Sequence, residues 1–177
     1  MATIVNVHDF INELLVAGGE NPHQGAGYEL CAMTEKYEPI YLTAALGYGF
    51  YVVLLDNLSD PDDVPEEYAE LIDGKDYTVN GRLYKWEGLR KHTAQFIYYW
   101  YQRNNVTQTS LVGQVKPKTE NANNAIVDFK ATKAYNDSVD GARSLKHFLT
   151  NNKDIYPDFV IAHQDRCVLT KINPFGI

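Results

Sequence analysis

The sequence predicts a mainly α fold, a helical bundle of about four to five helices with a short β-hairpin and a long extended arm. Two long segments, residues 83–105 and 125–152, support this prediction because apolar side chains recur in both at the three- and four-residue steps of an α-helix. An Asn-Gly dipeptide between two short runs predicts the hairpin. The 177 residues fit a single domain over the whole chain, with residues 106–124 as a protruding arm and residues 156–177 as a C-terminal tail.

Composition and charge narrow the classes of function. Apolar residues make up 45% of the chain and charged residues 22%, values typical of a globular protein. The formal net charge of −7 argues against stable nucleic-acid binding, which needs a basic surface to neutralise phosphates. The two cysteines, Cys31 and Cys167, lie far apart and indicate neither a zinc site nor a disulfide framework. The first residues lack the pattern of a signal peptide, so we expect synthesis in the cytoplasm.

The N-terminal region predicts two helices separated by a glycine-rich loop. Residues 8–17 are expected to form a short helix with Phe10 and Leu14 facing inward, ended by a pair of glycines. The following loop connects to a second helix that we expect to begin near Met33. Pro39 predicts a kink or a restart in that helix because proline cannot donate a backbone hydrogen bond.

Residues 40–55 contain no charged side chain and predict a buried helix. As a helix, these 16 residues would span only about 24 Å, which is short of the roughly 30 Å hydrocarbon core of a membrane. We therefore expect a core helix and no membrane association.

An acidic segment follows at residues 56–67, where four aspartates crowd together. Clustered carboxylates raise the alternative of a calcium site, but the spacing fails the EF-hand pattern. Capping is the better interpretation, because aspartate, serine and proline are favoured where short helices begin. Residues 64–72 then predict a short amphipathic helix ended by Gly74.

Residues 76–83 form the predicted hairpin around Asn80-Gly81, and the segment 83–105 continues as an amphipathic helix. Its apolar face is largely aromatic and comprises Trp86, Leu89, Thr93, Phe96, Ile97, Trp100 and Tyr101. Tyr98 and Tyr99 widen this aromatic belt beyond one stripe. They are candidates for contacts between subunits, because exposed rings are common anchors in interfaces, or they fill the core of the chain itself.

The arm, residues 106–124, is polar, and its few apolar residues include Leu111, Val112 and Val115. Loops of this length inside compact domains are commonly either functional or disordered. We therefore expect either an extended arm that adds a strand to a neighbouring subunit, with these three residues as contact candidates, or a mobile linker.

The second long helix, residues 125–152, has small residues in the middle of its apolar face, which permits close approach by the aromatic helix. Gly141 weakens it by about 1 kcal/mol relative to alanine. Residues 159–162 and 167–172 in the tail are possible strands. We expect the apolar C-terminus, which includes Ile172 and Phe175, to be docked on the domain.

No catalytic, cofactor-binding or metal-binding residues are predicted, and the chain is not expected to be an enzyme. Motifs of hydrolases, zinc proteases and cysteine nucleophiles do not occur. The five histidines are scattered. His92 and His147 lie on the two long helices and could meet in space, although two separate histidines without catalytic roles are the more ordinary interpretation.

The order of these features resembles the head-to-tail connector proteins, also called adaptor, ring or head-completion proteins, of tailed bacteriophages, most of all those of crAss-like phages that infect Bacteroides-type bacteria. The similarity covers residues 30–177. It is most specific in the aromatic helix, which ends in KWEGLRKHTAQFIYYWYQRNN, and in the following TQTSLVGQV; AYNDSV in the second helix and the ending KINPFGI add to it.

This resemblance implies a structural virion protein without catalytic residues. Such subunits are made in the host cytoplasm and assemble at the head-tail junction as a ring, usually of twelve copies. The ring contacts the portal protein on one side and tail or further ring proteins on the other, and DNA passes through its lumen without specific binding. The strand-prone tail departs from typical connectors. The alternatives are a tail completion or terminator protein, expected to be richer in β structure, and a small cytosolic enzyme or ligand-binding protein.

Overall fold

The computed structural model describes residues 3–60, 62–106, 108–110, 113–115, 124–165 and 168–173. It is mainly helical, at 61%, and the predicted helical bundle with a short hairpin is confirmed. The helices are α1 Gly25–Leu46, α2 Tyr48–Asn57, α3 Glu66–Asp73, α4 Leu89–Val106 and α5 Asn124–Asn151. The strands are β1 Lys75–Val79, β2 Arg82–Trp86, β3 Gln108–Ser110 and β4 Gly113–Val115, and single 3₁₀ turns occur at Val7–Asp9, Asn12–Leu14 and Ile161–His163.

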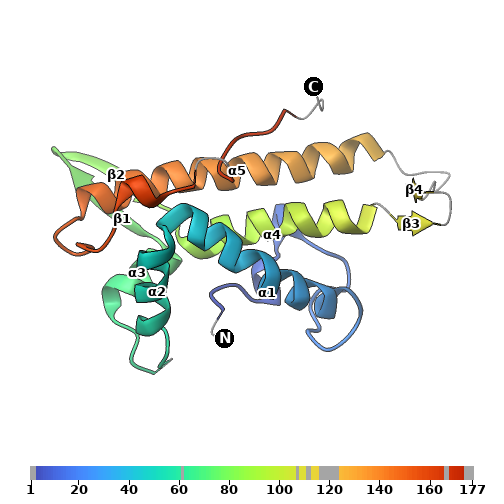
Figure 1. Cartoon of the computed structure of the whole chain (residues 1–177), viewed down its shortest axis with the longest axis horizontal. Coiled ribbons are helices and arrows are strands. Elements are labelled where there is room, and N and C mark those ends of the chain that lie inside the picture. The colour runs from blue at the N-terminus through green and yellow to red at the C-terminus, as the bar shows by residue number, and fades with distance from the viewer. Residues whose placement is uncertain are drawn as a thin grey trace.

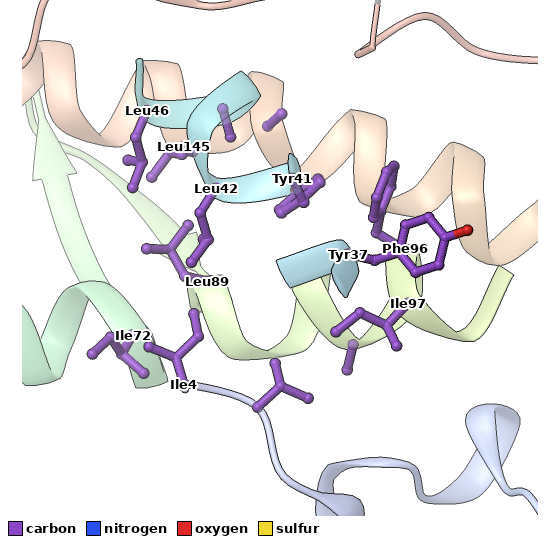
Figure 2. Packing of buried hydrophobic residues seen from close by; sticks show 14 of the residues in the cluster. Ile4, Tyr37, Tyr41, Leu42, Leu46, Ile72, Leu89, Phe96, Ile97 and Leu145 are labelled. Carbon is purple, nitrogen blue, oxygen red and sulfur yellow. The ribbon is translucent and has the colours of Figure 1, made fainter. Parts of the chain in front are cut away.

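Helices α4 and α5 form the centre of the fold as a long antiparallel pair, and α1 crosses in front of α4 (Figure 1). The small residues in the middle of α5 are on its buried face, as the sequence predicts: Ala131, Ala134, Ser138 and Ala142 are all buried. The core then extends into α1, α3 and the N-terminal segment, with Leu42, Ile72 and Ile4 among its members (Figure 2). One continuous core therefore joins the helices of the domain.

The hairpin prediction is confirmed. Strands β1 and β2 pair antiparallel with Val79 opposite Arg82, which leaves Asn80 and Gly81 as the two turn residues. Both have positive φ, 51° and 79°, as a type I′ turn requires. Each strand extends beyond the predicted residues 76–83.

The aromatic helix begins later than the sequence predicts, at Leu89 and not at residue 83. Trp86 belongs to β2, where it pairs with Lys75, and so the prediction that it lies on the helix is wrong. The chain turns between strand and helix at Gly88, whose φ is +91°. A Cβ there would lie 2.4 Å from the carbonyl oxygen of Ile72, so only glycine fits where the two chain segments cross.

The N-terminal helix predicted at residues 8–17 is wrong. Two 3₁₀ turns occur in its place, because Ile11 is extended between them and Asn12 has a φ of +54°. Phe10 is nevertheless buried, as expected. Helix α1 begins at Gly25, eight residues before the predicted Met33, and it continues through Pro39 without a break.

The single helix predicted at residues 40–55 is two helices. Helices α1 and α2 meet at Gly47 and are bent by 117°. Gly47 has φ 78° and ψ 147°, a conformation available almost only to glycine, and its α carbon faces the backbone and Cβ of His163. Among the described residues, no single helix is long and apolar enough to cross a membrane, although this bent pair meets the length and composition test together.

The described part of the arm is a second small hairpin in which β3 and β4 pair with one another. It lies beyond the ends of α4 and α5 at one tip of the molecule (Figure 1). Leu111 and Val112 lie outside the described residues, and Val115 is the last residue of β4. In the described segments, β3 and β4 therefore pair within the chain, and the addition of a strand to a neighbouring subunit stays a prediction.

The C-terminal tail contains no strand in its described residues, 156–165 and 168–173, so the strand predictions there are not met. The tail packs on α5 instead. The backbone of Ile172 exchanges two hydrogen bonds of 2.9 Å with the side chain of Asn136, and the hydroxyl of Tyr135 donates to the carbonyl oxygen of Val168 at 2.6 Å. Docking at Ile172 is confirmed, whereas Phe175 lies outside the described residues.

Candidate functional site

Tyr98 and Tyr99 were candidates for contacts between subunits, but both lie in the core of the chain. Their exposed fractions are 3% and 7%. The ring of Tyr99 packs 4.8 Å from that of Tyr135, and Arg103 donates a hydrogen bond of 2.7 Å to its hydroxyl. Neither ring is available to a neighbouring subunit in this structure, and the core alternative accounts for them.

His92 and His147 have different surroundings. His92 is buried between Trp86, at a ring distance of 5.4 Å, and Gly141 of α5, and burial lowers its pKa. His147 is exposed and lies against the first hairpin, where its Nδ1 is 2.5 Å from the hydroxyl of Tyr77. His92 therefore joins the end of β2, before the turn into α4, to α5, and His147 joins the first hairpin to α5.

An exposed apolar surface occurs beside the N-terminal turns. We define the strap-side patch as Ile11, Leu15 and Phe129, which are exposed by 57%, 58% and 58%. The ion pair of 3.0 Å between Glu13 and Lys133 joins the N-terminal turns to α5 one turn beyond Phe129. Two segments that this ion pair joins, the N-terminal turns and α5, therefore supply the exposed apolar side chains of the patch.

A second exposed apolar surface occurs at the α1–α2 corner. We define the corner patch as Tyr48, Val52, Val160 and Ile161, of which Tyr48 is exposed by 71%. The segment around Ile161 is fixed to the corner because Asp165 donates a backbone hydrogen bond of 2.9 Å to Ala44, and Phe50 and Phe159 are in ring contact. Neither patch is evident from the sequence, because neither follows one helical stripe.

A cleft of about 510 Å³ lies between the N-terminal turns, α4 and α5. Most of its charged side chains form ion pairs, among them Arg90 with Asp73 at 2.8 Å, Lys91 with Glu87 at 2.9 Å and Lys133 with Glu13 at 3.0 Å. Hydrogen bonds with Lys91 and Lys133 lower the pKa values of Glu87 and Glu13, respectively, and the carboxylates of Asp137 and Glu13 raise the pKa of Lys133. These shifts move the three pKa values away from neutrality, whereas an efficient general acid or base has a pKa near the working pH.

Among the described residues with a shifted pKa, one group has a pKa that moves toward neutrality. This group is the buried carboxyl of Glu38. It is 2% exposed, and desolvation raises its pKa to about 7. Glu38 is the only charged residue between Lys36 and Asp56 in the sequence, and this isolation in an apolar stretch is the signal that could have identified it. The carboxyl faces the N-terminal backbone and not the cleft.

The acidic segment is organised by local capping. The side chain of Asp60 accepts a hydrogen bond from the backbone of Asp62 at 3.1 Å, and the hydroxyl of Ser59 donates to the carbonyl oxygen of Asp56 at 2.8 Å. Within the described part of the chain, no three His, Cys, Asp or Glu side chains gather as a metal site would require. Pro65 precedes α3, consistent with the capping interpretation.

Comparison with known proteins finds no matching family model, no matching curated protein and no matching solved structure. The relation to phage connectors is therefore a proposal that rests on the sequence features and on the geometry of this chain.

Proposed function

We propose that this protein is a structural subunit of a phage virion, which assembles head to tail into a ring between portal and tail. The observation that carries the proposal is the pair of different apolar surfaces, the strap-side patch and the corner patch. A closed ring requires that one surface of each subunit meet a different surface of the next. Helix α2 and the N-terminal end of α5 lie toward opposite ends of the long axis, which suits such a contact (Figure 1).

The negative charge of the chain supports a channel through which DNA passes without being bound. The chain has a net charge of −7, and no lysine or arginine occurs between Lys36 and Lys75. An acidic surface repels the phosphate backbone, so DNA would pass the ring without specific contacts. The ring would meet the portal protein on one face and tail or further ring proteins on the other.

Two observations favour this function over its alternatives. A helix content of 61% favours a connector over a β-rich tail terminator. The pKa shifts of Glu13, Glu87 and Lys133 in the cleft all lead away from neutrality, which favours a structural role over an enzyme.

The test is native mass measurement of the purified chain at virion-like concentrations, alone and with the portal protein. We expect a closed ring, dodecameric if it follows the family, when portal is present. Ile11→Asp with Leu15→Asp should prevent ring formation, and so should Tyr48→Asp. Leu83→Asp is the matched control because Leu83 is 68% exposed on the first hairpin, outside both patches, and this variant should assemble.

Mixing the two patch variants gives a sharper test of head-to-tail contact. Each variant retains one intact surface, so the mixture should form heterodimers but no rings. Monomers alone from the unmodified chain with portal, or a stable small oligomer that carries a bound metabolite, would overturn the proposal.

A further inference from the structure

The N-terminal strap, which we define as residues 3–16, is held on the domain by side chains from two helices. Glu38 of α1 accepts hydrogen bonds from two consecutive backbone N–H groups, those of Ile4 and Val5, each at 3.0 Å. Arg90 of α4 donates to the carbonyl oxygen of Ile4 at 2.5 Å. Three neighbouring backbone groups of the strap are therefore satisfied by side chains in place of a strand partner.

The strap is also anchored by apolar burial. Ile4, Val5, Val7 and Phe10 are buried against α1, α3 and α4. The strap has no helix longer than one 3₁₀ turn, so its backbone depends on the two side-chain partners more than a regular element would.

The Arg90 guanidinium donates its hydrogen bonds to groups other than the Glu38 carboxyl. Its Nε donates to Asp73 at 2.8 Å, its Nη1 donates to the strap carbonyl, and Nη1 lies 3.8 Å from Asp9. The charged groups that affect the pKa of Glu38 are Arg90 from α4, which lowers it, and Asp9 from the strap, which raises it. The charge of Glu38 in turn helps to raise the pKa of Tyr51 in α2. Glu38 thus has two amide donors but no direct ion pair among its described contacts.

We propose that Glu38 is a pH-dependent latch for the N-terminal strap: the uncharged carboxyl keeps the strap closed, and the ionised carboxyl favours an open state in which water reaches it. Ionisation in the closed state places a charge in a site that is 2% exposed, which is costly unless the charge is paired. Lifting the strap exposes the carboxylate and removes that cost, whereas opening a neutral Glu38 gains nothing comparable.

The direction of the effect follows from linkage. The pKa of Glu38 is about 7 in the closed state, because desolvation outweighs the two amide donors and Arg90, and the usual value of 4.5 applies once the group is solvated. Since the closed state holds the proton more tightly, its extra stability is complete below about pH 4.5. That stability is lost as the pH rises toward 7 and changes little above it.

Amide hydrogen exchange of the full chain tests the latch. Protection of the Ile4 and Val5 amides, corrected for intrinsic rates, should fall about tenfold or more between pH 5 and pH 8 relative to the core amide of Leu145. Glu38→Gln keeps one acceptor oxygen and cannot ionise, so its protection should be independent of pH. Glu35→Gln, an exposed carboxyl on the same helix, is the matched control and should behave like the unmodified chain.

A second measurement does not depend on any variant. The side-chain carboxyl carbon of Glu38 should titrate in the unmodified protein with a midpoint near pH 7, together with the amide protons of Ile4 and Val5. A midpoint below pH 5.5, a protection that is constant or rises with pH, or an equal loss of protection at Leu145 would overturn the latch.

Discussion

Replacing Trp86 with alanine is expected to lower the free energy of unfolding by about 3–5 kcal/mol. The side chain is 1% exposed, and its Nε1 donates a hydrogen bond of 2.8 Å to the carbonyl oxygen of Leu71 in α3. The indole also stacks on Phe148 of α5 at a ring distance of 5.8 Å. Truncation would therefore open a cavity where α3, β2 and α5 meet and would leave a buried carbonyl without its donor.

Urea denaturation followed by circular dichroism measures this loss. Trp86→Phe keeps an aromatic ring but not the N–H donor, so it should cost less than the alanine variant. Leu83→Ala on the same strand removes a side chain that is 68% exposed and should change stability by less than about 0.5 kcal/mol. A loss below about 1 kcal/mol for Trp86→Ala would contradict the described packing.

Gly141→Ala is expected to destabilise the protein by about 1–3 kcal/mol, although alanine is the better helix former by about 1 kcal/mol. A Cβ at this position would lie 2.1 Å from Cγ and 2.3 Å from Nδ1 of His92. The His92 ring is buried and has Trp86 beside it, so it cannot move away without disturbing the α4–α5 contact.

Gly49→Ala provides the matched control because Gly49 lies in α2 and no atom lies within 4 Å of an added Cβ. This variant should be neutral or stabilised by up to about 1 kcal/mol. If the His92 ring causes the clash, the double variant Gly141→Ala with His92→Ala should lose less stability than the sum of the single variants. Equal stability of Gly141→Ala and the unmodified protein would contradict the account.

Features encoded by neighbouring residues were predictable from the sequence. Asn80 and Gly81 specify a type I′ turn through their own conformational preferences, and the hairpin was found at the right place. Helix α3 ends before Gly74, whose φ is +102°, as its sequence indicates. The small residues of α5 are likewise buried together, because helical spacing fixes which side chains share a face.

Features decided by distant contacts were not predictable. The uncharged run at residues 40–55 gives no sign of the 117° bend, which places Gly47 against His163 of the tail. The aromatic segment 83–105 gives no sign that Trp86 pairs with Lys75 in a strand. In both cases the choice between helix and another structure depends on a partner from another part of the chain.

The same limit applies to the candidate sites. Periodicity shows that Tyr98 and Tyr99 extend the aromatic belt, but not what covers them. In the structure, Tyr99 contacts Tyr135, on which the tail docks through Val168. The sequence marks Glu38 as an isolated charge in an apolar stretch, but only the fold shows that the strap backbone covers its carboxyl.

The proposal that this chain forms the ring between head and tail is tested most directly by locating the polypeptide in purified particles of a phage that encodes it. Mass spectrometry of the particles combined with cryo-electron microscopy of the neck should find the chain there, in a ring below the portal with neighbouring subunits in contact through the strap-side and corner patches. Absence of the chain from the particles, or its location away from the vertex that joins head and tail, would contradict the account.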